Sequence, residues 1–128
     1  MNIPEGYYFT ENHEWIKKEN GVAVIGISEY AVEELGDIVF VELPDIESEF
    51  NQGAGFAVLE SVKAVSDIFT PVSGLIIDVN KKLLEEPGLI NESPYDEGWL
   101  AKIKLSDIEE IGQLMDHIDY DTYIEEIE

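Results

Sequence analysis

The sequence predicts a single, mainly β domain with a short internal helix and a helical C-terminal region. Short apolar runs alternate with turn-forming residues through the first hundred positions, which is typical of strands. The chain has 128 residues, of which 45% are hydrophobic, and this suits one domain with a buried core. No linker or low-complexity segment divides it. We therefore expect one domain over residues 1–128, with a helical extension at about 106–128.

Several segments are expected to form strands because they are rich in β-branched and aromatic residues and are bounded by turn formers. They cover residues 13–17, 22–27, 38–43, 56–59, 65–70, 75–79 and 99–104. Asn20-Gly21 predicts a tight hairpin turn between the first two, because both residues tolerate a positive φ. Pro71 and Gly74 mark the break between residues 65–70 and 75–79.

Two regions predict helices. Ser28 to Leu35 reads as a short helix, with Ser28 accepting an amide hydrogen bond at its start and Gly36 ending it. From residue 106 onward, apolar residues recur at helical spacing, at Ile108, Ile111, Leu114 and Met115. The tail from Asp119 to Glu128 is expected to fray. Residues 85–98 are rich in turn formers and are expected to form a long loop.

Composition excludes several function classes. With 29 acidic and seven basic residues the net charge is −22, and every basic residue is lysine, which argues against nucleic-acid binding. The absence of cysteine excludes disulfides, thiolate catalysis and sulfur-based zinc sites. The N-terminus resembles neither a signal nor a transit peptide, and no apolar stretch is long enough to span a membrane. We expect a monomer in the bacterial cytoplasm, or a processed chain in the mitochondrial matrix.

Motifs for nucleotides and metals are also absent. Gly53-Ala54-Gly55 lacks the third glycine and the following helix of a dinucleotide site. His13 and His117 lie far apart, so no metal site is predicted and each histidine is interpreted as packed or solvated.

Lys63 differs from the other charged residues, because it is the only basic residue between Lys18 and Lys81. It lies between two predicted strands, which places Lys63-Ala64 at a hairpin tip. One interpretation is a charge that protects the hairpin from edge-to-edge pairing. The other is an amine that a prosthetic group acylates, which requires an accessible lysine on a well-defined turn. These residues alone leave both interpretations open.

Motifs along nearly the whole chain resemble the glycine cleavage system H-protein family. Glu60-Ser61-Val62-Lys63-Ala64 resembles its lipoyl-attachment signature. The other matching segments are His13-Glu14-Trp15, Gly36-Asp37-Ile38-Val39, Pro71-Val72-Ser73-Gly74, Asn80, Leu83, Pro87-Gly88-Leu89-Ile90-Asn91, Pro94-Tyr95 and Gly98-Trp99. The resemblance implies a barrel-sandwich hybrid, in which two small antiparallel sheets pack face to face and the modified lysine caps a hairpin.

The resemblance also implies a function, that of a non-catalytic carrier with lipoate attached at Lys63. The implied partners are glycine decarboxylase (P protein), aminomethyltransferase (T protein) and dihydrolipoyl dehydrogenase (L protein). These would load the aminomethyl group of glycine, pass its carbon to tetrahydrofolate and one-carbon metabolism, and reoxidise the dithiol. Lipoate-attaching enzymes are implied to recognise Glu60 and Gly74. A cleft for the arm is implied beside the hairpin, formed by Asn12, Glu14, Ala31, Leu35 and Asp67.

Two alternatives stay open at this point. The same lysine could serve a lipoate relay or another lipoyl-dependent pathway. The chain could also be a non-lipoylated acidic interaction module, in which Lys63 only guards the hairpin.

Overall fold

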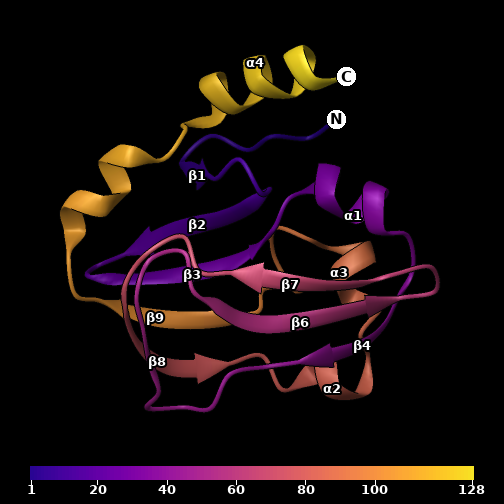
Figure 1. The fold of residues 1–128 in the computed structure, drawn as a ribbon, viewed down its shortest axis with the longest axis horizontal. Coiled ribbons are helices and arrows are strands. Elements are labelled where there is room, and N and C mark those ends of the chain that lie inside the picture. Colours follow the sequence, from indigo (N-terminus) through magenta and orange to yellow (C-terminus); the bar gives the residue numbers. More distant parts are fainter.

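The computed structural model describes all 128 residues and contains two antiparallel sheets that pack face to face (Figure 1). The larger sheet has the strand order β1-β2-β3-β9-β8-β5, and the smaller has the order β4-β6-β7. The bounds are β1 Tyr7–Phe9, β2 Glu14–Glu19, β3 Val22–Ile27, β4 Ile38–Glu42, β5 Glu49–Phe50, β6 Gly55–Ser61, β7 Val65–Phe69, β8 Gly74–Val79 and β9 Ala101–Leu105. The predicted fold class is confirmed.

The expected strands correspond to β2, β3, β4, β6, β7, β8 and β9. The sequence does not predict β1 and β5, which have three and two residues. Runs this short show no alternation of apolar and polar residues, and both form because a neighbouring strand offers a free edge. Asn20 and Gly21 have φ values of +49° and +73°, as the predicted turn requires.

The internal helix, α1, spans Glu29–Leu35, as expected. The hydroxyl oxygen of Ser28 accepts a hydrogen bond from the Ala31 N–H at 3.2 Å, and Gly36 ends the helix with a φ of +80°. The expectation of a loop over 85–98 is wrong in part. Two single-turn helices, α2 (Lys82–Glu85) and α3 (Leu89–Glu92), lie in and next to this region. They form because Leu83 and Ile90 are fully buried, which composition-based turn signals do not reveal.

The C-terminal region is helical but has a break. A 3₁₀ helix (η1, Ile108–Gln113) is followed by an extended segment and then by α4 (His117–Ile127). Leu114 and Met115, expected on one helix face, lie in the break, because Phe9 and Met115 exchange backbone hydrogen bonds of 2.8 and 2.9 Å. The expected fraying of the tail is also wrong. The Tyr120 ring stacks on Phe9 with centroids 4.2 Å apart, and this contact holds α4 over β1.

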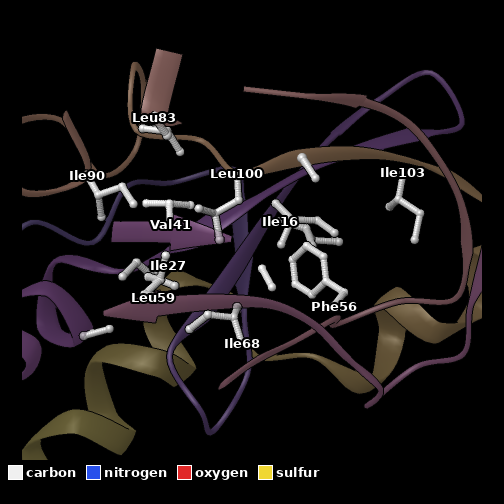
Figure 2. Close-up of a cluster of buried hydrophobic side chains, with 14 of the residues drawn as sticks. Ile16, Ile27, Val41, Phe56, Leu59, Ile68, Leu83, Ile90, Leu100 and Ile103 are labelled. Carbon is white, nitrogen blue, oxygen red and sulfur yellow. The ribbon is translucent and has the colours of Figure 1, made fainter. Parts of the chain in front are cut away.

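The core lies between the two sheets. Apolar side chains from both sheets and from the short helices meet there (Figure 2). Its labelled members are Ile16, Ile27, Val41, Phe56, Leu59, Ile68, Leu83, Ile90, Leu100 and Ile103. A second cluster, built on Phe9, Trp15, Val24, Tyr120 and Ile124, holds α4 on the outer face of the larger sheet. No helix is long and apolar enough to cross a membrane.

Candidate functional site

The turn between β6 and β7 is held together by Ser61. Its buried hydroxyl oxygen accepts hydrogen bonds from the N–H groups of Lys63 and Ala64, at 3.3 and 3.1 Å. The Ser61 N–H donates to the Ala64 carbonyl at 2.8 Å. Such serine hydroxyl bonds to the following N–H groups help to fix the shape of a turn. Lys63 is therefore exposed on an ordered tip, and this tip between β6 and β7 lies at the right edge of Figure 1.

A clamp from α3 ties this tip to the rest of the molecule. The Val62 N–H donates to the Asp37 carbonyl at 3.0 Å, so the tip leans on the segment between α1 and β4. Asn91 holds that segment on both sides: its Oδ1 accepts from the Ile38 N–H and its Nδ2 donates to the Gly36 carbonyl, both at 2.9 Å. The sequence does not mark Asn91 as a site residue, because its partners are more than 50 positions away.

The Lys63 stem passes over the end of α1. Its Cε lies 3.7 Å from where a Cβ atom would stand on Gly36. This direction is significant because α1 also supplies Ala31 and Leu35 to a cavity of about 300 Å³ beside the hairpin.

That cavity lies between α1, β7 and the turn before β2. All five residues of the expected cleft line it, so the fold brings together positions that span 56 residues of sequence, from Asn12 to Asp67. The complete lining is Glu11, Asn12, His13, Glu14, Ile27, Ala31, Glu34, Leu35, Ser66, Asp67, Ile68 and Phe69. It combines four carboxylates with apolar walls. Glu11, His13, Glu34 and Phe69 were not expected there, because each looks like an ordinary solvent or core position in its own segment.

Glu14 is the most buried carboxylate of the cavity, with 2% of its surface exposed. Its Oε1 accepts a hydrogen bond from the Thr10 hydroxyl, and its Oε2 accepts one from the Phe69 N–H at 3.3 Å. Burial raises the pKa of Glu14, and these hydrogen bonds oppose the rise. A cation entering the cavity would reverse this effect of burial, because it would favour the ionised carboxylate.

His13 is a half-buried member of the cavity wall and has a positive φ of +70°. Its Nδ1 lies 2.8 Å from the hydroxyl of Tyr120 on α4. Burial lowers the pKa of His13, with the charge of Glu34 acting in the opposite direction. His13 is thus partly packed, as one of the two expectations had it, and it also lines a cavity, which the sequence does not predict.

The two residues expected to guide lipoate attachment lie far apart. Glu60 is exposed one strand position from the tip, paired across the sheet with Phe40 and Val65. Gly74 begins β8 in the other sheet, at the opposite end of the molecule from the tip (Figure 1). A Cβ on Gly74 would stand 2.0 Å from the Lys104 carbonyl oxygen, so the packing of β8 on β9 itself requires a glycine here. The structure holds no group of His, Cys, Asp or Glu side chains arranged to bind a metal.

Comparison with known proteins identifies the family of this chain. The sequence model described as glycine cleavage H-protein matches residues 7–127. The chain belongs to the glycine cleavage H-protein family. The glycine cleavage system H protein of Halothermothrix orenii is 55% identical over all of both chains, and that of Staphylococcus epidermidis strain RP62A is 47% identical over 98% of this chain and all of the relative.

A solved structure supports the fold of the family as well. The crystal structure of a glycine cleavage system H protein from Mycobacterium marinum superposes with a TM-score of 0.86 at 34% identity, covering 97% of this chain and 98% of the other. H proteins carry lipoate covalently on a lysine and are not catalysts themselves. The chain is accordingly a lipoyl carrier of the glycine cleavage system, serving its P, T and L proteins.

Proposed function

We propose that Lys63 is the lysine that carries lipoate and that the cavity beside it shelters the aminomethyl group during transfer between partners. The lipoyl group, when bound, supplies the dithiolane that accepts this group from glycine and later returns electrons to the L protein. The supporting observation is the course of the Lys63 stem over Gly36, at the end of the helix whose Ala31 and Leu35 line the cavity.

The cavity suits a cationic amine beside an apolar chain. Glu14 and Asp67 are the carboxylates we assign to the amine, and Ala31 and Leu35 are the apolar walls for the arm. Exclusion of water strengthens pairing between the amine and a carboxylate. The pairing also keeps the amine protonated, and a protonated nitrogen has no lone pair with which to expel the sulfur. Asn12 adds an exposed polar group at the rim.

We assign the attachment signal mainly to Glu60. Its exposed carboxylate stands next to the ordered tip, where a modifying enzyme must bind. Gly74 contributes to recognition through the fold, because a side chain at that position would displace β9 and so disturb the sheet.

The whole chain, residues 1–128, acts as one carrier domain. The hydroxyl of Tyr120 on α4 contacts both His13 and Ser28, so the helical extension is part of the same packed unit. We assign the carrier to the bacterial cytoplasm, because the named relatives are bacterial.

Intact-mass analysis tests the attachment site. The chain produced with a lipoate-attaching enzyme should gain one lipoyl group, and Lys63→Arg should gain none. Lys81→Arg is the matched control, since it removes an exposed lysine elsewhere and should be modified like the wild type. A lipoyl group on Lys63→Arg would overturn the assignment.

The lifetime of the loaded protein tests the cavity. With Glu14→Gln and Asp67→Asn combined, the aminomethyl group should be lost to water several-fold faster, measured as formaldehyde released in the absence of T protein. Asp121→Asn with Glu125→Gln makes the same charge change on the exposed face of α4 and should leave the lifetime unchanged. Equal lifetimes for the two pairs would contradict the proposal.

A further inference from the structure

A buried hydrogen-bond chain connects the C-terminal helix with the cavity wall. The hydroxyl of Tyr120 lies 2.8 Å from Nδ1 of His13 and 2.7 Å from Oγ of Ser28. Tyr120 and Ser28 are both 0% exposed, whereas His13 lines the cavity. Ser28 also begins α1, so one hydroxyl contacts two elements that shape the cavity, and it comes from the helix at the top of Figure 1.

Counting hydrogens fixes the direction of this chain. Ser28 Oγ accepts from the Ala31 N–H, and the hydrogen of its own hydroxyl needs an acceptor because the residue has no contact with solvent. The Tyr120 oxygen is the acceptor in reach. Since it receives the Ser28 hydrogen, Tyr120 directs its own hydrogen to Nδ1 of His13. A neutral ring whose Nδ1 accepts must carry its proton on Nε2.

We propose that Tyr120 and Ser28 are positioning residues that hold His13 at the cavity wall as an Nε2–H donor, with no free nitrogen lone pair offered to the cavity. The inference rests on the proposed role of the cavity. It adds a reason why a histidine in the cavity wall does not speed the loss of the aminomethyl group. Nδ1 is occupied by Tyr120, so Nε2 is the ring nitrogen that remains available to the arm.

The way in which the aminomethyl group is lost to water explains why this tautomer is favourable. Loss begins when a base takes a proton from the cationic amine. The nitrogen lone pair then forms a bond to the methylene carbon while the carbon–sulfur bond breaks, and its electron pair leaves with the sulfur. Addition of one water gives formaldehyde and ammonia, and the sulfur takes up a proton. An unprotonated Nε2 would be such a base, whereas an Nε2–H group can only donate.

The same chain opposes protonation of His13. A protonated ring would need Nδ1–H to donate to Tyr120, which would then have to donate to Ser28 and leave the Ser28 hydrogen without an acceptor. A second cation in the cavity would also repel the amine. The groups that face His13 are Tyr30 and Glu34 from α1, Tyr120 and Tyr123 from α4, and Glu11, Glu14 and Asp67 around the cavity.

Nitrogen NMR of the unlipoylated protein, with ¹⁵N-labelled histidine, tests the tautomer directly. We expect His13 to carry its proton on Nε2 and to show Nδ1 as a hydrogen-bonded acceptor. Tyr120→Phe keeps the stack on Phe9 but removes the hydroxyl, so the Nδ1 signal should move to that of a free acceptor and the pKa of His13 should rise. A proton on Nδ1 in the wild type, or unchanged signals in Tyr120→Phe, would overturn the proposal.

Tyr123→Phe is the matched control. It removes the hydroxyl of another tyrosine near His13, which reaches only the Glu11 carbonyl at 3.4 Å. Its His13 signals and pKa should match the wild type. A shift as large as that of Tyr120→Phe would mean that loosening of α4, and not the hydroxyl, controls His13, and would overturn the proposal.

The lifetime of the loaded protein supplies the functional test. Tyr120→Phe should release formaldehyde several-fold faster than the wild type, with a pH dependence that follows the titration of His13. Adding His13→Gln should slow the release again, because the imidazole that acts as the base is removed. If the Glu14 and Asp67 variants speed release but Tyr120→Phe does not, this inference fails while the cavity keeps its role. If none of them changes the release, both proposals fail.

Discussion

The Cε atom of Lys63 lies 3.7 Å from the position that a Cβ atom would take on Gly36. The Lys63 stem thus runs from the ordered hairpin tip beside the end of α1, the helix that lines the cavity. Gly36 has a φ of +80° and a ψ of −160°, a conformation in which a side chain is strained. Lys63 therefore runs beside a backbone conformation that only glycine adopts readily, at the end of the helix that lines the cavity.

Replacing Gly36 should destabilise the protein. Gly36→Ala is expected to lower the free energy of unfolding by about 1–3 kcal/mol, because alanine must adopt the same strained conformation. Urea denaturation measures the loss. Gly112→Ala is the control, since a Cβ there meets nothing within 4 Å and the φ is not positive. If Gly36→Ala loses no more unfolding free energy than Gly112→Ala, alanine is not strained at position 36.

Removing the Asn91 clamp should loosen the hairpin tip. Asn91→Ala leaves the Gly36 carbonyl and the Ile38 N–H without their partners, which should cost about 1–3 kcal/mol of unfolding free energy. Hydrogen exchange should also become faster at Val62, whose N–H bonds to the clamped segment. Asn51→Ala, at an exposed position whose side chain makes no hydrogen bond, should leave the Val62 exchange unchanged. Unaltered exchange in Asn91→Ala would rule out the clamp.

The raised pKa of Glu14 predicts a specific pH dependence. Because burial raises the pKa in the folded state above its ordinary value of 4.5, the folded protein binds this proton more tightly than the unfolded chain. The stabilisation from Glu14 is therefore complete below pH 4.5 and is lost as pH rises through the folded-state pKa. As pH increases, the unfolding free energy of Glu14→Gln should therefore increase relative to that of the wild type. Urea titrations between pH 4 and 7 measure this difference. If the difference in unfolding free energy between the two proteins stays constant across this range, the pKa of Glu14 is not raised.

The buried face of α4 should carry most of its contribution to stability. Ile124 is 5% exposed and packs in the cluster around Tyr120, whereas Ile118 on the same helix is 63% exposed. Ile124→Ala should lower the unfolding free energy by about 2–5 kcal/mol. Ile118→Ala should change it by less than about 0.5 kcal/mol. Similar effects of the two substitutions, measured by chemical denaturation, would show that the tail does not dock as the structure indicates.

Most of the fold was predictable, because the strands of both sheets contain enough residues to show their composition and turn signals. Asn20-Gly21 and Ser28 with Gly36 are local signals that the structure realises directly. The failures have two causes. β1 and β5 are too short to show a pattern, and the turns of α2 and α3 and the docked α4 depend on distant partners, such as Phe9 for Tyr120, which no local pattern contains.

The expected cleft also depends on contacts between distant segments. Its five members were named through the family resemblance, and they do line one cavity. Local patterns could not have grouped them, because Asn12 comes from the turn before β2 and Asp67 from β7 in the other sheet, and they share a cavity only once the two sheets and α1 have packed. His13 illustrates the limit most clearly. Its sequence context suggests a packed or solvated residue, and only the approach of Tyr120, 107 positions away, gives its Nδ1 a hydrogen-bond partner.

The sequence by itself determined the class of the molecule: a small, acidic, cysteine-free β domain with one lysine isolated at a hairpin tip. These properties depend on composition and on neighbours within a few positions, so they can be read directly. The tertiary structure decided which carboxylates share a cavity, where the Lys63 stem runs and which nitrogen of His13 lies against the Tyr120 hydroxyl. Each of these depends on burial and on contacts between distant segments, and both arise only when the two sheets and α4 have packed.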